Sequence, residues 1–151
     1  MKIAIEISLF IIAFVILCSF KIFLPLKTAT LSITITDLRS TTADVLITIC
    51  AESPNFPSDQ KIIKSFIEKP NGKKVITVTI PNLPEGEYAV TTFQDMNGDG
   101  KLTTNFIGAP KDPFGFSNNF KPRFKGPKWN DCKFFFSEQN NQQTIKLITL
   151  F

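Results

Sequence analysis

The chain has 151 residues and a formal charge of +4, and 16 of its residues are phenylalanine. This length predicts a single domain, and the aromatic composition argues against a disordered chain. The sequence contains no histidine, which excludes Ser-His-Asp and Cys-His catalysis, histidine zinc sites and histidine pH switches. The mild positive charge favours anionic surfaces in general, and we expect no nucleic-acid partner.

The N-terminus contains an apolar run from Ile7 to Phe20. Its length is typical of the hydrophobic part of a signal peptide, whereas a membrane span needs about 20 apolar residues. We therefore expect residues 1–27 to be a signal peptide or, if uncleaved, an N-terminal membrane anchor. Lipid attachment at Cys18 is a further alternative. The predicted location is the periplasm, the cell envelope or the extracellular space, with membrane contact through this segment if it stays attached.

Alternating apolar and polar residues predict strands through residues 28–151. In the strands at 30–36 and 43–51 we expect one apolar face to meet the core. These faces consist of Leu31, Ile33 and Ile35, and of Val45, Ile47 and Ile49. Further strands are predicted at 61–68, 74–80, 88–93, 132–137 and 144–150. About seven short strands with one long loop excursion predict an all-β domain, an immunoglobulin-like or transthyretin-like β-sandwich.

The third of these strands has an alternative. Apolar residues in 61–68 also recur at helical spacing. The turn signal Pro70-Asn71-Gly72 and the strand pattern after it favour a β-hairpin of 61–68 with 74–80.

Tyr88 enters its strand just after a turn at Pro84-Glu85-Gly86. A tyrosine in this position suggests a tyrosine corner, in which the hydroxyl bonds a backbone group near the turn. A plain cross-strand aromatic contact is the alternative.

The loop after this strand is rich in oxygen-bearing side chains, spaced as in the first half of a calcium loop. The candidate metal ligands are Asp95, Asn97, Asp99, Lys101 through its carbonyl, and Asn105. Phe106 stands where an EF-hand has a glutamate, so Asp112 or water would have to complete the shell. We expect weak calcium affinity, on the order of 0.1–1 mM. The alternative is a glycine-rich turn that its own side chains hold without an ion.

Two cysteines lie in the predicted domain, Cys50 at the end of one strand and Cys132 at the start of another. Because cysteines of an exported domain more often pair than stay free, we expect a disulfide. It would close a loop of roughly 80 residues and stabilise the fold by about 4 kcal/mol. The alternative is two buried thiols too far apart to bond.

The long segment between 94 and 131 places aromatic residues beside polar or basic ones, and such a loop is commonly functional. The candidate binding residues are Phe114, Phe116, Asn118, Asn119, Arg123, Lys125 and Trp129. Their rings and charges would hold an anionic glycan or lipid head group through stacking and charge. Alternatively, the rings fill the end of the core and the cations are solvated.

Long stretches of the chain resemble a known bacterial family. They include Asn-Leu-Pro-Glu-Gly-Glu-Tyr-Ala-Val at 82–90 and Asp-Met-Asn-Gly-Asp-Gly-Lys-Leu at 95–102, and continue through 104–110 and 114–119. In these the chain resembles the family catalogued as domain of unknown function 2141. It departs from the family at Gln94, where a histidine is common. The resemblance implies an exported sandwich domain and implies no reaction.

We therefore expect a non-catalytic binding or structural module of the cell envelope. Its partner would be an envelope glycan, a lipid or a protein. The alternative is a carboxylate- or metal-dependent enzyme acting on an envelope substrate, with Asp95, Asp99 and Asp112 as its acids. No pairing of a nucleophile with a base is recognisable in the sequence, which favours the module.

Overall fold

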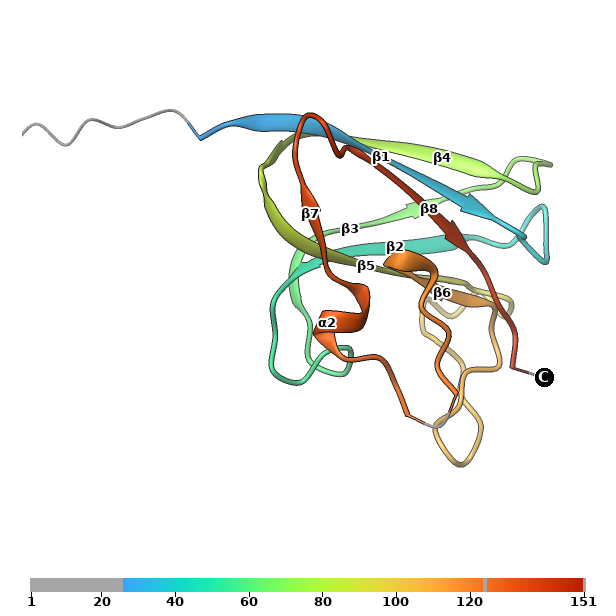
Figure 1. Ribbon diagram of the computed structural model, residues 1–151. Helices are drawn as coiled ribbons and strands as arrows, with labels where there is room; N and C mark the ends of the chain where they lie inside the picture. Colours follow the sequence, from blue (N-terminus) through green and yellow to red (C-terminus); the bar gives the residue numbers. More distant parts are fainter. Residues whose placement is uncertain (1–25, 124, 151) are drawn as a thin grey trace, which may run out of the picture.

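The structure is a computed structural model that describes residues 26–123 and 125–150. Residues 1–25 lie outside it, and with them Cys18 and all but the last two residues of the predicted signal peptide or anchor. In the part of the chain that is described, no helix is long and apolar enough to cross a membrane. The described residues form eight strands in two sheets, which confirms the all-β prediction (Figure 1).

The smaller sheet has the order β4-β1-β8, and the larger has the order β3-β2-β5-β6, with β7 also paired to β5. The strands are β1 (Thr28–Thr36), β2 (Val45–Ala51), β3 (Lys61–Glu68), β4 (Ile76–Pro84), β5 (Gly86–Gln94), β6 (Phe114–Phe116), β7 (Phe134–Phe136) and β8 (Gln142–Lys146). Strand β1 is antiparallel to β4 and parallel to β8, while the pairs in the larger sheet are antiparallel. Figure 1 shows the two sheets stacked one above the other.

The core lies between the sheets and contains both predicted apolar faces. Leu31, Ile33 and Ile35 of β1 are fully buried, as are the three predicted residues of β2. Phe136 of β7 and Ile145 of β8 complete the same cluster. Burying one such side chain stabilises the fold by about 1.5–3 kcal/mol, so alternation in the sequence is enough to set which face turns inward.

The predicted hairpin of 61–68 with 74–80 is wrong. Both segments contain strands, but β3 pairs with β2 while β4 pairs with β1. The turn between them therefore carries the chain from one sheet to the other. Asn71 and Gly72 have positive φ angles of 51° and 84°, and the Gly72 amide donates to the Thr41 carbonyl at 3.0 Å. The turn signal was correct, but it carries no information about the partner of each strand.

Tyr88 forms the predicted tyrosine corner. Its hydroxyl donates to the Pro84 carbonyl at 2.9 Å, and its ring packs edge-on against Phe136 with ring centres 6.2 Å apart. A single residue, Glu85, separates β4 from β5, so the chain passes between the sheets at this corner. Burial raises the pKa of the Tyr88 hydroxyl.

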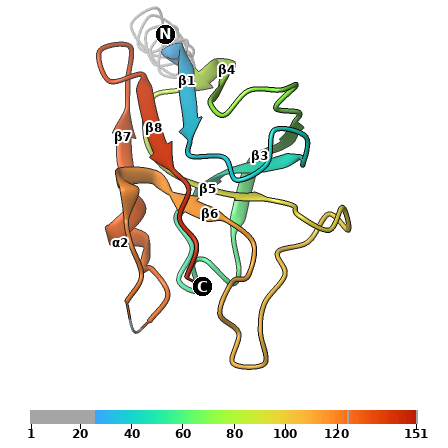
Figure 2. The ribbon, with the colours of Figure 1, turned by 90° about the vertical axis from the view of Figure 1, so that its right-hand side faces the viewer.

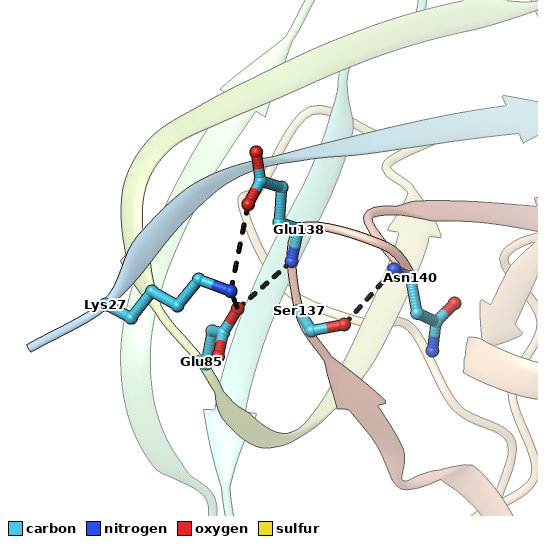
Figure 3. A network of polar contacts seen from close by, with 5 residues as sticks. All are labelled: Lys27, Glu85, Ser137, Glu138 and Asn140. Atoms are coloured by element: carbon cyan, nitrogen blue, oxygen red, sulfur yellow. Dashed lines mark hydrogen bonds and ion pairs between the residues drawn. The ribbon is translucent and has the colours of Figure 1, made fainter.

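A network of charged and polar groups holds the same end of the molecule (Figure 3). Lys27 Nζ lies 3.1 Å from Glu85 Oε1 and 3.7 Å from Glu138 Oε2. The Glu138 amide also donates to Glu85 Oε1 at 3.3 Å. The hydrogen bond from Lys27 is the main cause of the lowered pKa of Glu85. These contacts tie the start of β1 to the β4–β5 corner and to the turn between β7 and β8.

The short strand β6, which the sequence did not predict, closes the other side of the sandwich. It pairs with the second half of β5, whereas β7 pairs with the first half. Between the two pairings, the Val90 amide of β5 donates to Ser117 Oγ at 2.9 Å. Ser117 begins a short 3-10 turn, η1 (Ser117–Asn119). Phe114 and Ile148 exchange backbone hydrogen bonds of 3.0 and 2.8 Å. The chain after β8 thereby joins the edge of the larger sheet.

Candidate binding cleft

Gln94, at the end of β5, fixes the point where the long loop leaves the sheet. Its side chain is fully buried, and Oε1 accepts from the Arg39 and Ser40 amides at 2.8 and 3.0 Å. Nε2 donates to the Ser40 and Ala43 carbonyls at 2.7 and 3.2 Å. The amide thus makes four hydrogen bonds, two as acceptor and two as donor. Sequence analysis missed this role because the partners lie far away in the chain.

Asp95 holds the start of the loop through the loop's own amides. Its Oδ1 accepts from Gly98 at 2.8 Å and its Oδ2 from Gly100 at 2.7 Å. Burial acts to raise the pKa of Asp95, but hydrogen bonds from Gly100, Gly98 and two further backbone amides outweigh it, so the pKa is lowered. Gly98 and Gly100 have positive φ angles of 77° and 75°, a conformation that glycine adopts without a steric penalty.

The other candidate metal ligands also bond groups within the loop. Asn97 Nδ2 donates to Asp99 Oδ2 at 3.0 Å, and the Lys101 amide donates to Asp99 Oδ1 at 2.8 Å. Asn105 Oδ1 accepts from the Ile107 and Ala109 amides at 3.0 and 2.9 Å. Among residues 26–123 and 125–150, no group of three or more acidic or cysteine side chains is placed to hold a metal ion. These side chains are therefore already hydrogen-bonded within the loop.

Asp112 holds the far end of the same loop. It is almost fully buried, and its two oxygens accept from the Met96 amide at 3.3 Å and the Thr103 amide at 2.8 Å. The Lys111 amide donates to the Thr103 carbonyl at 2.8 Å. Two buried carboxylates, Asp95 and Asp112, therefore give the loop from 95 to 112 a defined shape without a core of its own.

The shaped loop forms one wall of a cleft of about 730 Å³ on the outer face of the larger sheet. The floor comes from three strands and consists of Thr48, Thr91, Phe93, Phe114 and Phe116. Phe114 and Phe116 contact each other edge-on, with ring centres 5.7 Å apart. Figure 2 shows the 95–112 segment and the residues 120–123 and 125–128 extending to the same side of this sheet, away from β1.

The walls of the cleft are apolar and its rim is basic. The loop from 95 to 112 contributes Leu102 and Ile107, and the end of the described chain contributes Leu150. Arg123 and Lys125 lie on the opposite wall, and both are exposed. Among the described residues that line the cleft, none carries a carboxylate. The charged side chains of the described lining are therefore two cations.

Four of the seven predicted binding residues line this cleft: Phe114, Phe116, Arg123 and Lys125. The other three lie elsewhere and are structural. Asn118 Nδ2 donates to the Lys133 carbonyl at 2.9 Å, and Asn119 bonds the backbone of Thr144 and Lys146 at 2.9 and 2.8 Å. Their amides, which looked like ligand donors, replace missing backbone partners.

Trp129 is buried in a second, smaller core. It begins the short helix α2 (Trp129–Cys132) and packs edge-on against Phe56 with ring centres 5.8 Å apart. This cluster covers one end of the outer face of the larger sheet, beside Ala89 of β5. Its position agrees with the alternative in which aromatic residues of the loop cap the sandwich.

The predicted disulfide is not formed in the structure. Cys50 and Cys132 are free thiols, both buried in this second core. Cys50 Sγ donates to the Ala89 carbonyl on the neighbouring strand at 3.4 Å. Burial raises the pKa of each thiol to about 12. The two cysteines thus pack as small apolar residues in one cluster.

Fold and cleft together define an all-β, two-sheet domain with an open, basic-rimmed cleft on the outside of one sheet. The chain belongs to a bacterial family described as "Uncharacterized protein conserved in bacteria (DUF2141)", which matches residues 33–144. The match spans β2 to β7 together with the long loop, and confirms the resemblance. No curated protein and no solved structure matched the chain.

Proposed function

We propose that the domain is a non-catalytic binding module of the cell envelope and that the cleft is its binding site. The observation that carries the proposal is a cleft of about 730 Å³, within the usual range of roughly 300–1,000 Å³ for ligand sites. Its floor is built from strands, and its wall is a loop that two buried carboxylates hold in place. A rigid floor and a fixed wall reduce the entropy lost when a ligand binds.

The roles of the acidic residues support a module over the enzyme alternative. Asp95 and Asp112 are buried and accept hydrogen bonds from backbone amides, so they act as supports for the loop. Asp99 is exposed and bonds Asn97 and Lys101 within the same turn. None of the three lines the cleft. A catalytic carboxylate would be expected within reach of a bound substrate.

The strand order favours the transthyretin-like alternative for the sandwich. In an immunoglobulin constant domain the first, second, fifth and fourth strands form one sheet. Here the first strand lies between β4 and β8, while β2 and β5 belong to the other sheet. We infer a transthyretin-like arrangement on this basis.

Export, and calcium binding by the 95–105 loop, remain predictions from the sequence. Export is tested by the mass of the mature N-terminus and by fractionation of the native cells. Calcium binding predicts a rise in melting temperature at millimolar calcium that Asp95→Asn removes. An unchanged melting temperature would refute calcium binding by this loop.

An array of glycans and lipids, probed with the purified protein, tests the proposed function. The informative variant is Thr91→Trp, which places a large ring on the floor of the cleft. Thr77→Trp is its match, because Thr77 is a strand threonine on the outside of the other sheet and its hydroxyl likewise bonds a side chain. We expect array binding by the wild type and by Thr77→Trp, and its loss in Thr91→Trp. Equal profiles for all three proteins would refute the cleft as the site.

A further inference from the structure

We propose that the cleft takes a single-chain anionic amphiphile, a molecule with one apolar chain and a carboxylate head of the fatty-acid type. This inference rests on the proposed binding function and gives it a ligand class. Three features of the cleft carry it: the apolar floor, the uncovered apolar walls, and the sign of the charge at the rim.

The floor offers aromatic surface from two neighbouring strands. Phe93 of β5 is directly opposite Phe114 of β6, and Thr91 is opposite Phe116. Phe114 is itself buried and packs edge-on against Phe116, so Phe93 on β5 and Phe116 on β6, both half-buried, provide the accessible aromatic surface. Strand pairing fixes these positions before any ligand arrives. An extended hydrocarbon chain buries the most area against such a surface, at roughly 25 cal/mol per Å².

The walls leave apolar side chains in water. Leu102, Ile107 and Leu150 are 39%, 71% and 41% exposed, and all three line the cleft. Leu102 and Ile107 lie on the 95–112 loop and Leu150 lies near the end of the chain, so together they would flank a chain lying on the floor. Asp112 accepts from the Thr103 amide beside Leu102, and Asn105 accepts from the Ile107 amide, so the loop's own hydrogen bonds hold the backbone at both positions. A ligand that covers them gains free energy without requiring the loop to rearrange.

The charge at the rim selects the head group. Arg123 and Lys125 are the charged members of the described lining, and none of the other described lining residues carries a carboxylate. Arginine binds a carboxylate through two parallel hydrogen bonds. The other polar side chains, such as Thr48, Ser58 and Gln60, are neutral. A cationic head group would meet repulsion here.

A glycan fits the same surface less well. Sugars need a dense set of hydrogen-bond partners around each ring, and a site that leaves hydroxyls unpaired loses affinity. Most of the described lining is aromatic, aliphatic, proline or glycine, and its neutral polar side chains are three threonines, Ser58 and Gln60. Thr91 Oγ1 already donates to Gln60 Oε1 at 3.4 Å. The apolar area and the two cations therefore point to an amphiphile.

The test is calorimetric titration of the full protein with monomeric dodecanoate, dodecyl phosphate and dodecyltrimethylammonium. We expect dodecanoate to bind at one site, and octanoate to bind at least about tenfold more weakly because fewer methylenes are buried. Dodecyl phosphate distinguishes a carboxylate site from a general anion site. Dodecyltrimethylammonium should bind at least about tenfold more weakly than dodecanoate, because its charge is reversed at the rim.

Two pairs of variants locate the binding. Arg123→Glu combined with Lys125→Glu should weaken dodecanoate about tenfold and strengthen dodecyltrimethylammonium. Lys69→Glu with Lys73→Glu makes the same change in net charge outside the cleft, and should leave both affinities unchanged. Thr91→Trp should abolish binding, whereas Thr77→Trp should not. Circular dichroism and thermal unfolding establish whether each variant is folded. If Thr91→Trp is unfolded, the combined Arg123→Glu and Lys125→Glu variant still locates the binding.

Several outcomes would overturn the ligand class. Equal affinity for the anionic and cationic amphiphiles would remove the role of the rim, and tighter dodecyl phosphate binding would replace the carboxylate with a phosphate head. Binding to phosphatidylglycerol vesicles without binding of monomers would mean a membrane surface as the partner. Array binding that Thr91→Trp abolishes, without amphiphile binding, would leave the proposed function standing and refute this ligand. No cleft-dependent binding in either assay would refute both.

Discussion

Replacing Gln94 by alanine should destabilise the domain more than any exposed substitution. The side chain makes four hydrogen bonds to the backbone of 39–43. Each contributes about 1 kcal/mol net, so their loss costs about 4 kcal/mol. For a domain of this size the melting temperature should then fall by about 10 °C or more. Equilibrium unfolding in urea, followed by circular dichroism, measures the change directly.

Gln142→Ala is the control, since Gln142 is exposed on β8, and its effect should stay within about 0.5 kcal/mol. Gln94→Glu keeps the shape of the side chain but turns a carboxylate oxygen toward the Ser40 and Ala43 carbonyls. Burial should raise the pKa of the new carboxyl, so this variant should lose stability as the pH rises from about 4 toward 7. A loss below about 1 kcal/mol in Gln94→Ala would refute the view that this amide fixes the loop.

Three further predictions follow from the contacts described. Asp95 has a lowered pKa, so its contribution to the stability of the fold is present above about pH 4 and is lost as the pH falls further. In urea unfolding, the difference in stability between wild type and Asp95→Asn should therefore shrink toward pH 2, and a constant difference would contradict this. Gly115→Ala places a Cβ 2.7 Å from Ile145 Cγ2 and 3.2 Å from the Lys146 carbonyl, and should lower the free energy of unfolding in urea by about 2 kcal/mol. Gly126→Ala is the control, because its Cβ meets no atom within 4 Å. Equal effects of the two substitutions would argue against the close approach of β6 and β8. The pKa values of Cys50 and Cys132 are raised to about 12, so both thiols should resist alkylation in the folded protein and react in denaturant without reductant. Peptide mapping measures this, and a pair of peptides linked by a disulfide would contradict the free thiols.

Much of the fold could be predicted because β1, β2 and β5 alternate cleanly. An apolar residue placed on the wrong face of such a strand would lose its burial, so the sequence pattern fixes orientation. Tyr88 was predictable for the same local reason, since turn and strand are adjacent in sequence. Strand pairing is not local, and 61–80 shows the limit: a good turn signal was compatible with a hairpin and equally with a crossing between sheets.

The cleft was half predictable. The aromatic and basic character of 114–125 was visible in the sequence, but the floor depends on Phe114 and Phe116 lying beside Thr91 and Phe93. Strand β6 has three residues, too few for an alternating pattern to identify it as a strand, so its partner could not be inferred. Asn118, Asn119 and Gln94 show the reverse difficulty. An amide side chain has the same composition whether it faces a ligand or completes a backbone hydrogen bond.

Lys27 and its partners Glu85 and Glu138 fasten the chain where it enters the sandwich (Figure 3). That entry belongs to the smaller sheet, and in Figures 1 and 2 the two loops that wall the cleft extend from the opposite side of the molecule. A support attached ahead of Lys27 would therefore hold the domain at the side opposite the cleft. The open side of the cleft would face away from that support, so a ligand could bind and dissociate while the domain stays attached.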